Sequence, residues 1–249
     1  MRSLFRGPNR RASNNDRRKP SQKLLGLRAL LPESENATLR VLDLGPARAA
    51  NLDFFSRYGG HLTVADFYSG LRTARAATSG EDGDDDRKAK AFAELLPFDK
   101  ATRFDLVLAW DLLNYLTPQE QHLLMTCLEP FCLAGTAILA FVSMQKEMPP
   151  APSAYSIRDA DTLLYEEREG RARPCPRYLE GDLLKRMQGL TVENRYQLRN
   201  GMLEYVFSYR MSSRPSSSPA KASSTPSRSN ESLRYRLEPA SRWSSTPSR

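Results

Sequence analysis

Residues 41–55 read VLDLGPARAANLDFF (Val41 to Phe55), and this stretch decides the expected fold. It continues an apolar run that begins at Leu39, and the run is typical of a buried β-strand. Gly45 follows the strand directly. Residues 47–58 then have helical periodicity, with Leu52, Phe55 and Tyr58 expected on one face and Gly59-Gly60 as the stop signal. The stretch therefore predicts a strand, a tight turn and a helix.

A second strand is expected at Leu62–Phe67 (LTVADF), and it carries an acid near its end. Gly45 has no Cβ, so its backbone can approach a ligand closely. The helix beginning near Ala47 offers free N–H groups to a carboxylate or phosphate. Asp66 lies 23 residues after Asp43, where a carboxylate can accept hydrogen bonds from both ribose hydroxyls. Together these features predict a nucleoside-binding site.

Strand-like and helical segments continue to alternate along the chain, which is typical of an α/β protein with a doubly wound, mostly parallel sheet. An Asn200-Gly201 pair between the last two strands is a strong hairpin signal. Thr117, Pro118 and Glu120 form a helix start signal. The remaining expected strands are Phe104–Trp110, Gly135–Ser143, Leu190–Leu198 and Met202–Tyr209, and the remaining expected helices are Thr117–Phe131 and Arg177–Met187.

The turn and the acid of the second strand resemble the class I S-adenosylmethionine-dependent methyltransferases, in which a strand ending in D-x-G-x-G-x-G precedes the first helix. Ala47 and Ala49 stand where that motif has its second and third glycines. The resemblance covers about residues 39–209. It implies a Rossmann-like sheet of seven strands with the last strand antiparallel, and S-adenosylmethionine as cofactor. The cofactor-binding residues that it implies are Asp43, Gly45, Ala47, Asp66, Phe67, Glu94 and Trp110.

Residues 95–120 read LLPFDKATRFDLVLAWDLLNYLTPQE and resemble a second stretch of the same family. The resemblance implies that Glu94 contacts the adenine and that the substrate faces the end of the strand at Trp110. Asp111, Asn114 and Tyr115 are therefore the candidate catalytic residues. Methyl transfer from a sulfonium depends mainly on positioning and desolvation, so a polar helper is optional.

Three functions compete on these residues. The first is a methyltransferase acting on an unidentified small molecule or protein. The second is a catalytically inactive methyltransferase-like binding module. A nicotinamide-dependent dehydrogenase is disfavoured, because pyrophosphate binding requires a glycine where this chain has Ala47. No residue pattern selects the methyl acceptor.

Charge and composition divide the chain into three parts. The net charge of +8 resolves into about +7 for residues 1–23, −5 for residues 24–209 and +6 for residues 210–249. We expect a methyltransferase-like domain at 24–209 between disordered basic tails, the second of which is rich in serine and repeats SSTPSR. Nucleic acid or another acidic partner would bind only through these tails. A mitochondrial transit peptide is an alternative interpretation of the N-terminal segment, because the segment is rich in arginine and poor in acidic residues.

The remaining composition argues against several other classes. Three cysteines without CxxC spacing and two histidines favour neither a disulfide framework nor a metal site. The acidic run GEDGDDD at residues 80–86 does not match a calcium-binding EF-hand loop. No apolar run is long enough to span a membrane. The expected location is cytoplasmic.

Overall fold

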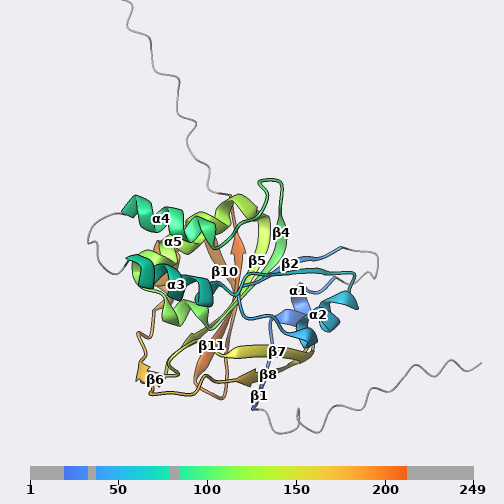
Figure 1. The fold of residues 1–249 in the computed structure, drawn as a ribbon. Coiled ribbons are helices and arrows are strands. Elements are labelled where there is room, and N and C mark those ends of the chain that lie inside the picture. The colour runs from blue at the N-terminus through green and yellow to red at the C-terminus, as the bar shows by residue number, and fades with distance from the viewer. Residues whose placement is uncertain (1–19, 33–37, 79–84, 212–249) are drawn as a thin grey trace, which may run out of the picture. The chain divides into compact units, whose positions relative to one another are not determined.

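The computed structural model describes residues 20–32, 38–78 and 85–211, drawn in colour in Figure 1. Its main sheet has six strands in the order β10-β11-β5-β4-β2-β3. Strands β3, β2, β4 and β5 are mutually parallel, whereas β11 runs antiparallel to both β5 and β10. The bounds are β2 Arg40–Asp43, β3 His61–Val64, β4 Phe104–Trp110, β5 Cys132–Ser143, β10 Leu190–Gln197 and β11 Met202–Tyr209.

The expected count of seven strands is wrong for the described residues, which supply six to this sheet. The connection from β3 to β4 forms two helices, and its described part contains no strand. Ala and Lys make up half of the second of these helices, and both residue types favour helix over strand. The helices of the chain are α1 Leu27–Leu30, α2 Ala49–Ser56, α3 Phe67–Thr78, α4 Asp85–Glu94, α5 Pro118–Leu128 and α6 Glu180–Arg186, with 3₁₀ turns at Leu112–Tyr115 and Glu129–Phe131.

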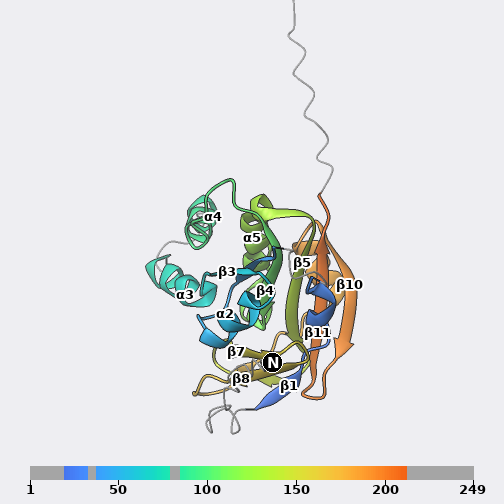
Figure 2. The same cartoon turned by 90° about the vertical axis from the view of Figure 1, so that its right-hand side faces the viewer.

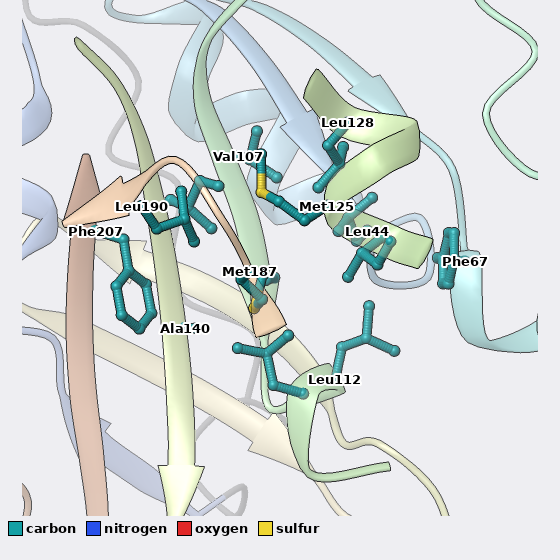
Figure 3. Close-up of a cluster of buried hydrophobic side chains, with 14 of the residues drawn as sticks. Leu44, Phe67, Val107, Leu112, Met125, Leu128, Ala140, Met187, Leu190 and Phe207 are labelled. Carbon is teal, nitrogen blue, oxygen red and sulfur yellow. The ribbon is translucent and has the colours of Figure 1, made fainter. Parts of the chain in front are cut away.

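Alternation along the central strands divides the core between the two faces of the sheet. Val107 and Ala109 of β4 belong to the cluster that includes α3, α4, α5 and α6, whereas Leu106 and Leu108 belong to the cluster that includes α2. Figure 3 shows Val107 lying toward the α5 side chains. Figure 1 shows α3, α4 and α5 on one side of the sheet and α2 on the other, and Figure 2 views the molecule from the side of α2. The fold therefore has three layers.

The helix after Gly45 is shorter than expected, and one residue of its expected common face is exposed. It begins at Ala49 rather than near Ala47, and Leu52, which was expected on the same face as Phe55, is 47% exposed. Phe55 is buried as expected, together with Phe54. Both phenyl rings pack against the sheet and outweigh the smaller apolar surface of Leu52.

Two local signals in the sequence are confirmed. The Thr117 side chain accepts a hydrogen bond from the Glu120 N–H, and the Glu120 carboxylate accepts one from the Thr117 N–H, which forms a capping box at the start of α5. The last two strands form a hairpin. Its turn places Gly201 at a φ of +78°, which glycine adopts without strain.

A small antiparallel sheet, β1-β8-β7, was not predicted. Its strands are β1 Ser21–Lys23, β7 Ala154–Asp159 and β8 Thr162–Glu166, and the side chains of β7 and β8 join the cluster that contains α2. Strand β1 pairs with residues about 140 positions away, with Ser21 opposite Leu164. Local sequence patterns carry no information about such a pairing. The folded part thus begins before the expected boundary at residue 24.

Most of the two expected basic tails lies outside the described residues, as do the SSTPSR repeats and most of the acidic run at 80–86. Their disorder and any role in binding stay predictions. In the part of the chain that is described, no helix combines the length and the apolar character that crossing a membrane requires.

Glu204 ties the N-terminal segment to the main sheet. Its carboxylate is fully buried and accepts hydrogen bonds from the N–H groups of Leu25, at 2.9 Å, and Gly26, at 2.6 Å. Leu24 and Leu27 on either side are fully buried. The segment after β1 is thus held by two hydrogen bonds and two apolar anchors.

Replacing Glu204 with alanine should therefore lower the free energy of unfolding by about 2 kcal/mol or more, because two buried N–H groups lose their acceptor. Urea denaturation of the two proteins measures this. Glu193→Ala on the neighbouring strand is the control, because Glu193 is exposed and should cost little. Equal losses for the two variants would contradict the anchoring role of Glu204.

Candidate functional site

A cavity of about 580 Å³ opens at the carboxyl ends of the central parallel strands. Residues 44–46 after β2, Asp66 after β3 and residues 109–112 at the end of β4 line it. The chain leaves β2 toward β3 on one side, and β4 lies on the other side of β2. The cavity thus occupies the topological switch point, where open α/β sheets bind their ligands.

Asp43 lies beneath the cavity and connects three of the segments around it. It is fully buried, and its Oδ1 accepts hydrogen bonds from the Gly45 N–H at 2.8 Å and the Trp110 indole N–H at 2.6 Å. Its Oδ2 accepts from the Asn51 amide at 3.0 Å. Burial raises the pKa of Asp43, and these three hydrogen bonds oppose the rise. The carboxylate links β2, α2 and β4, and each of its oxygens accepts at least one hydrogen bond from the protein.

Asn51 extends this network to the small sheet. Its amide also donates to the Tyr155 carbonyl at 3.3 Å, and its Oδ1 accepts from the Ile157 N–H at 2.8 Å. Arg48, next to the start of the same helix, pairs with Glu166 at 2.9 Å. The turn after β2 is therefore held by the hydrogen bond from Gly45 to Asp43, and the start of α2 is held by the contacts of Asn51 with β7 and of Arg48 with β8.

Gly45 lines the cavity, but the side chains of Trp110 and Asp43, rather than a ligand, leave no room for a Cβ at this position. A Cβ here would lie 3.0 Å from Cδ1 of Trp110 and 3.1 Å from Oδ1 of Asp43. Both distances are shorter than ordinary van der Waals contact. The indole of Trp110 therefore makes the close approach that the sequence analysis expected of a ligand.

Two residues that line the cavity have left-handed backbone conformations, which are uncommon for residues other than glycine. Asp66 has a φ of +39° and Trp110 a φ of +47°. Asp66 lies two residues after β3, and Trp110 is the last residue of β4. Such strain concentrates at binding sites, and here it turns the Asp66 side chain and the end of β4 toward the same cavity.

A second cavity of about 400 Å³ adjoins the first. Asp111, Pro150, Ser153 and Arg168 line both cavities and so form their common wall. The 144–175 excursion and the small sheet enclose much of the second cavity. The protein thus places two spaces on either side of one buried carboxylate.

Asp111 is 3% exposed and lies at the end of β4. Its Oδ2 accepts a hydrogen bond from the Ser153 N–H at 3.1 Å, and its Oδ1 is buried without a hydrogen-bond partner. Burial raises the pKa of Asp111 to about 7, although hydrogen bonds from Ser153 and Tyr155 oppose the rise. A carboxyl with this pKa can gain or lose a proton near neutral pH.

The other two candidate catalytic residues line the second cavity only. The Asn114 amide donates to the carbonyls of Asp111 and Phe141, both at 2.9 Å, and its Oδ1 accepts from the Ser143 N–H at 2.8 Å. Its hydrogen bonds are therefore committed to joining β4 and β5. Burial raises the pKa of Tyr115, so its hydroxyl stays protonated and can donate.

Four of the seven expected cofactor-binding residues do not line the first cavity, namely Asp43, Ala47, Phe67 and Glu94. Ala47 is exposed before α2, and Phe67 is fully buried with its ring against Phe92. Glu94 lies at the exposed end of α4, in a different groove between α3 and α4. The helical connection from β3 to β4 carries Glu94 away from the strand ends. Of the expected set, Gly45, Asp66 and Trp110 come together at the cavity, with Asp43 beneath them.

No local sequence pattern predicted the residues that close the site from the 144–175 excursion. Ser153 and Arg168 line both cavities, and Tyr155 stacks on Trp110 with ring centroids 5.2 Å apart. The sequence PPAP at residues 149–152 indicates a break in regular structure, but it does not indicate where the segment folds back.

The geometry defines a class of protein: an α/β protein with a ligand crevice at the switch point of its sheet. No protein-family model and no curated protein matches the chain. Some solved structures are similar to it. They include the 1,6-didemethyltoxoflavin-N1-methyltransferase of Burkholderia thailandensis with S-adenosylhomocysteine bound (16% identity, 73% of this chain and 76% of that chain, TM-score 0.40), the PH0226 protein of Pyrococcus horikoshii OT3 (14%, 74% and 88%, 0.44), and the N-methyltransferase NodS of Bradyrhizobium japonicum WM9 (16%, 74% and 92%, 0.39).

Two of these three proteins are methyltransferases by name. With identities of 16% or less and TM-scores below 0.5, the likeness by itself assigns neither an activity nor a ligand to this chain. The features of the chain that bear on function are the two cavities and the residues between them.

Gly45→Ala should lower the free energy of unfolding by about 1–3 kcal/mol, because the added methyl overlaps the Trp110 indole and the Asp43 carboxylate. Gly181→Ala is the matched control. Gly181 lies in α6 with no atom near its added Cβ, so that variant should be stabilised by about 0.5–1 kcal/mol. A Gly45→Ala protein as stable as the wild type would show that the contact is relieved without cost.

Asp111→Asn should stabilise the protein at pH 8. The folded-state pKa of Asp111, about 7, lies above the ordinary value of 3.8. The folded state therefore binds more protons between these values, and stability falls as the pH rises through that window. The neutral amide escapes this loss, so we expect a gain on the order of 2–4 kcal/mol at pH 8 and almost none at pH 4.

Denaturant unfolding at both pH values measures this difference, with Asp105→Asn as the control. Hydrogen bonding and ion pairing with Arg40 lower the pKa of Asp105, so its replacement should destabilise the protein at pH 8. A destabilised Asp111→Asn protein at pH 8 would mean that the Asp111 carboxylate is better solvated or better paired than the structure indicates.

Proposed function

We propose that the chain is an S-adenosylmethionine-dependent methyltransferase, in which the first cavity holds the cofactor and the second holds the methyl acceptor. One observation carries this proposal: two adjoining cavities share a buried carboxylate at the switch point of the sheet. Group transfer between two ligands requires two such spaces in contact. A site that only binds one ligand does not need the second cavity.

The residues of the first cavity suit this cofactor. Its volume of about 580 Å³ is within the usual range for ligand sites of about 300–1,000 Å³. Asp66, at the end of β3, is the residue we assign to the ribose hydroxyls. Arg72, Arg168 and Glu169 give the lining both signs of charge, which matches a ligand that carries an ammonium, a carboxylate and a sulfonium. Trp110 and the backbone at Gly45 form the inner wall.

When bound, the cofactor supplies an activated methyl group. The chain's own residues then need to orient the acceptor, exclude water and manage one proton. The wall of Pro150, Ser153 and Asp111 separates the two spaces and limits access of solvent. The buried Asp111 carboxylate can accept a proton from the acceptor, because its pKa is near 7.

The alternative is a catalytically inactive binding module of the same fold. It is supported by Asp43, whose oxygens are both used within the protein, and by Ala47, which does not line the cavity. Such a module would bind the cofactor or its demethylated product without turnover.

We also propose a cytoplasmic location for the chain. The three cysteines, all of them free thiols, support this proposal.

Titration calorimetry should detect micromolar binding of S-adenosylmethionine and S-adenosylhomocysteine to the full chain. Asp66→Ala should weaken both by at least about tenfold, since a charged hydrogen-bonding group is lost. Ala47→Gly is the control and should leave both affinities unchanged, because Ala47 is exposed outside the cavity. Absence of binding at millimolar ligand would refute the cofactor assignment for enzyme and inactive module alike.

A further inference from the structure

We propose that the second cavity recognises a small amine that also bears a hydrogen-bond acceptor, and that Asp111 and Gln22 are the two groups that recognise it. This inference rests on the proposed function, because it identifies the chemical class of the methyl acceptor. It also assigns a part of the site to β1, the strand that the N-terminal segment contributes.

Two unpaired buried atoms point to this ligand. Among the described residues, three buried side-chain nitrogen or oxygen atoms have no hydrogen-bond partner, and two of them belong to residues that line the second cavity. One is Oδ1 of Asp111, which can accept a hydrogen bond. The other is Nε2 of Gln22, which can only donate. Leaving such groups unpaired costs stability, so a ligand that pairs with both would gain from them.

Gln22 is held in place by contacts on both sides. Its backbone pairs with Leu163 in the small sheet, and its Oε1 accepts a hydrogen bond from the Asn200 amide at 2.6 Å. The next residues are tied down by Glu204 through the N–H groups of Leu25 and Gly26. Because Oε1 is engaged, Nε2 is the part of this amide that is left for a ligand.

The charge of the second cavity favours a cation over an anion. Asp111, Glu147 and Glu167 contribute carboxylates to its lining, against the single guanidinium of Arg168. The lining also contains Tyr115, Tyr155 and Tyr165, whose rings suit an organic cation. A carboxylate or phenolate acceptor would be repelled by these carboxylates.

The proton balance distinguishes an amine from an alcohol. The Asp111 carboxylate takes one proton from the bound ammonium, which frees the nitrogen lone pair. That lone pair forms the new N–C bond as the S–C bond breaks, and the bonding electrons stay on sulfur as a neutral thioether. The methylated ammonium product keeps the positive charge, and the Asp111 proton passes to water. A base with a pKa of about 7 suits an ammonium much better than an alcohol.

The test is a binding measurement with the full chain saturated with S-adenosylhomocysteine. The probes are a panel of small primary amines that carry a hydroxyl or carbonyl group, such as tyramine, each with the carboxylate and the neutral molecule of the same skeleton, such as 4-hydroxyphenylacetate and 4-ethylphenol. Ligand-observed NMR at pH 8 ranks the affinities. We expect at least one amine to bind about tenfold or more tightly than both of its analogues.

Matched variants test whether Gln22 and Asp111 are the groups that bind the amine. Gln22→Met should weaken the best amine by about tenfold. Gln145→Met is the control, because Gln145 lines the same cavity but its amide already donates to the Asn200 carbonyl at 2.8 Å. Asp111→Asn should abolish the preference for the amine over its neutral analogue. Thermal unfolding of each variant shows whether the fold is retained, and Gln22→Leu is a second substitution if Gln22→Met is unstable.

Three results would overturn the inference: equal or tighter binding of the carboxylates or neutral analogues, absence of binding by every amine, or equal losses in Gln22→Met and Gln145→Met. The proposed function fails separately. If S-adenosylhomocysteine does not bind, the cofactor assignment is lost, while the ranking of amines against their analogues can still be measured on the protein without it.

Discussion

The Asp43 carboxylate is the interaction on which the site depends. It is buried at the end of the first parallel strand of the main sheet, where an isolated charge would be costly, and three hydrogen bonds offset that cost. Those bonds come from the turn at Gly45, from α2 through Asn51 and from β4 through Trp110. One side chain therefore fixes the spacing of the strand ends that line the first cavity. The Trp110 indole fills the space that a Cβ at position 45 would need.

The two buried carboxylates at this edge of the sheet have opposite roles. Asp43 has a protein partner on each oxygen, whereas Asp111 keeps one buried oxygen unpaired between two cavities. An unpaired acceptor lowers stability, and evolution retains such groups where a ligand or a reaction uses them. Asp43 therefore fixes the end of β4 through Trp110, and this places Asp111, the next residue, between the two cavities.

The second cavity is built from parts of the chain that are far apart in sequence. Gln22 comes from the N-terminal strand, Asp111 from the end of β4 and Ser153 from the segment between β5 and β7. The small sheet joins the first and third of these, and Glu204 anchors the N-terminal segment beside it. Recognition of the acceptor would then depend on the docking of the N-terminal segment as well as on the central sheet.

The sequence by itself determined the α/β class, most of the central strands, the capping box of α5 and the positions of Gly45 and Asp66 after two of the strands, because local periodicity and turn chemistry encode these features. Only the tertiary structure decided that Asp43 is internal, that Glu94 lies away from the cavity and that the sheet has six strands in the described residues. It also decided the small sheet and the second cavity. These features depend on pairings such as Gln22 with Leu163, and the energy of a long-range contact is absent from any local stretch of sequence.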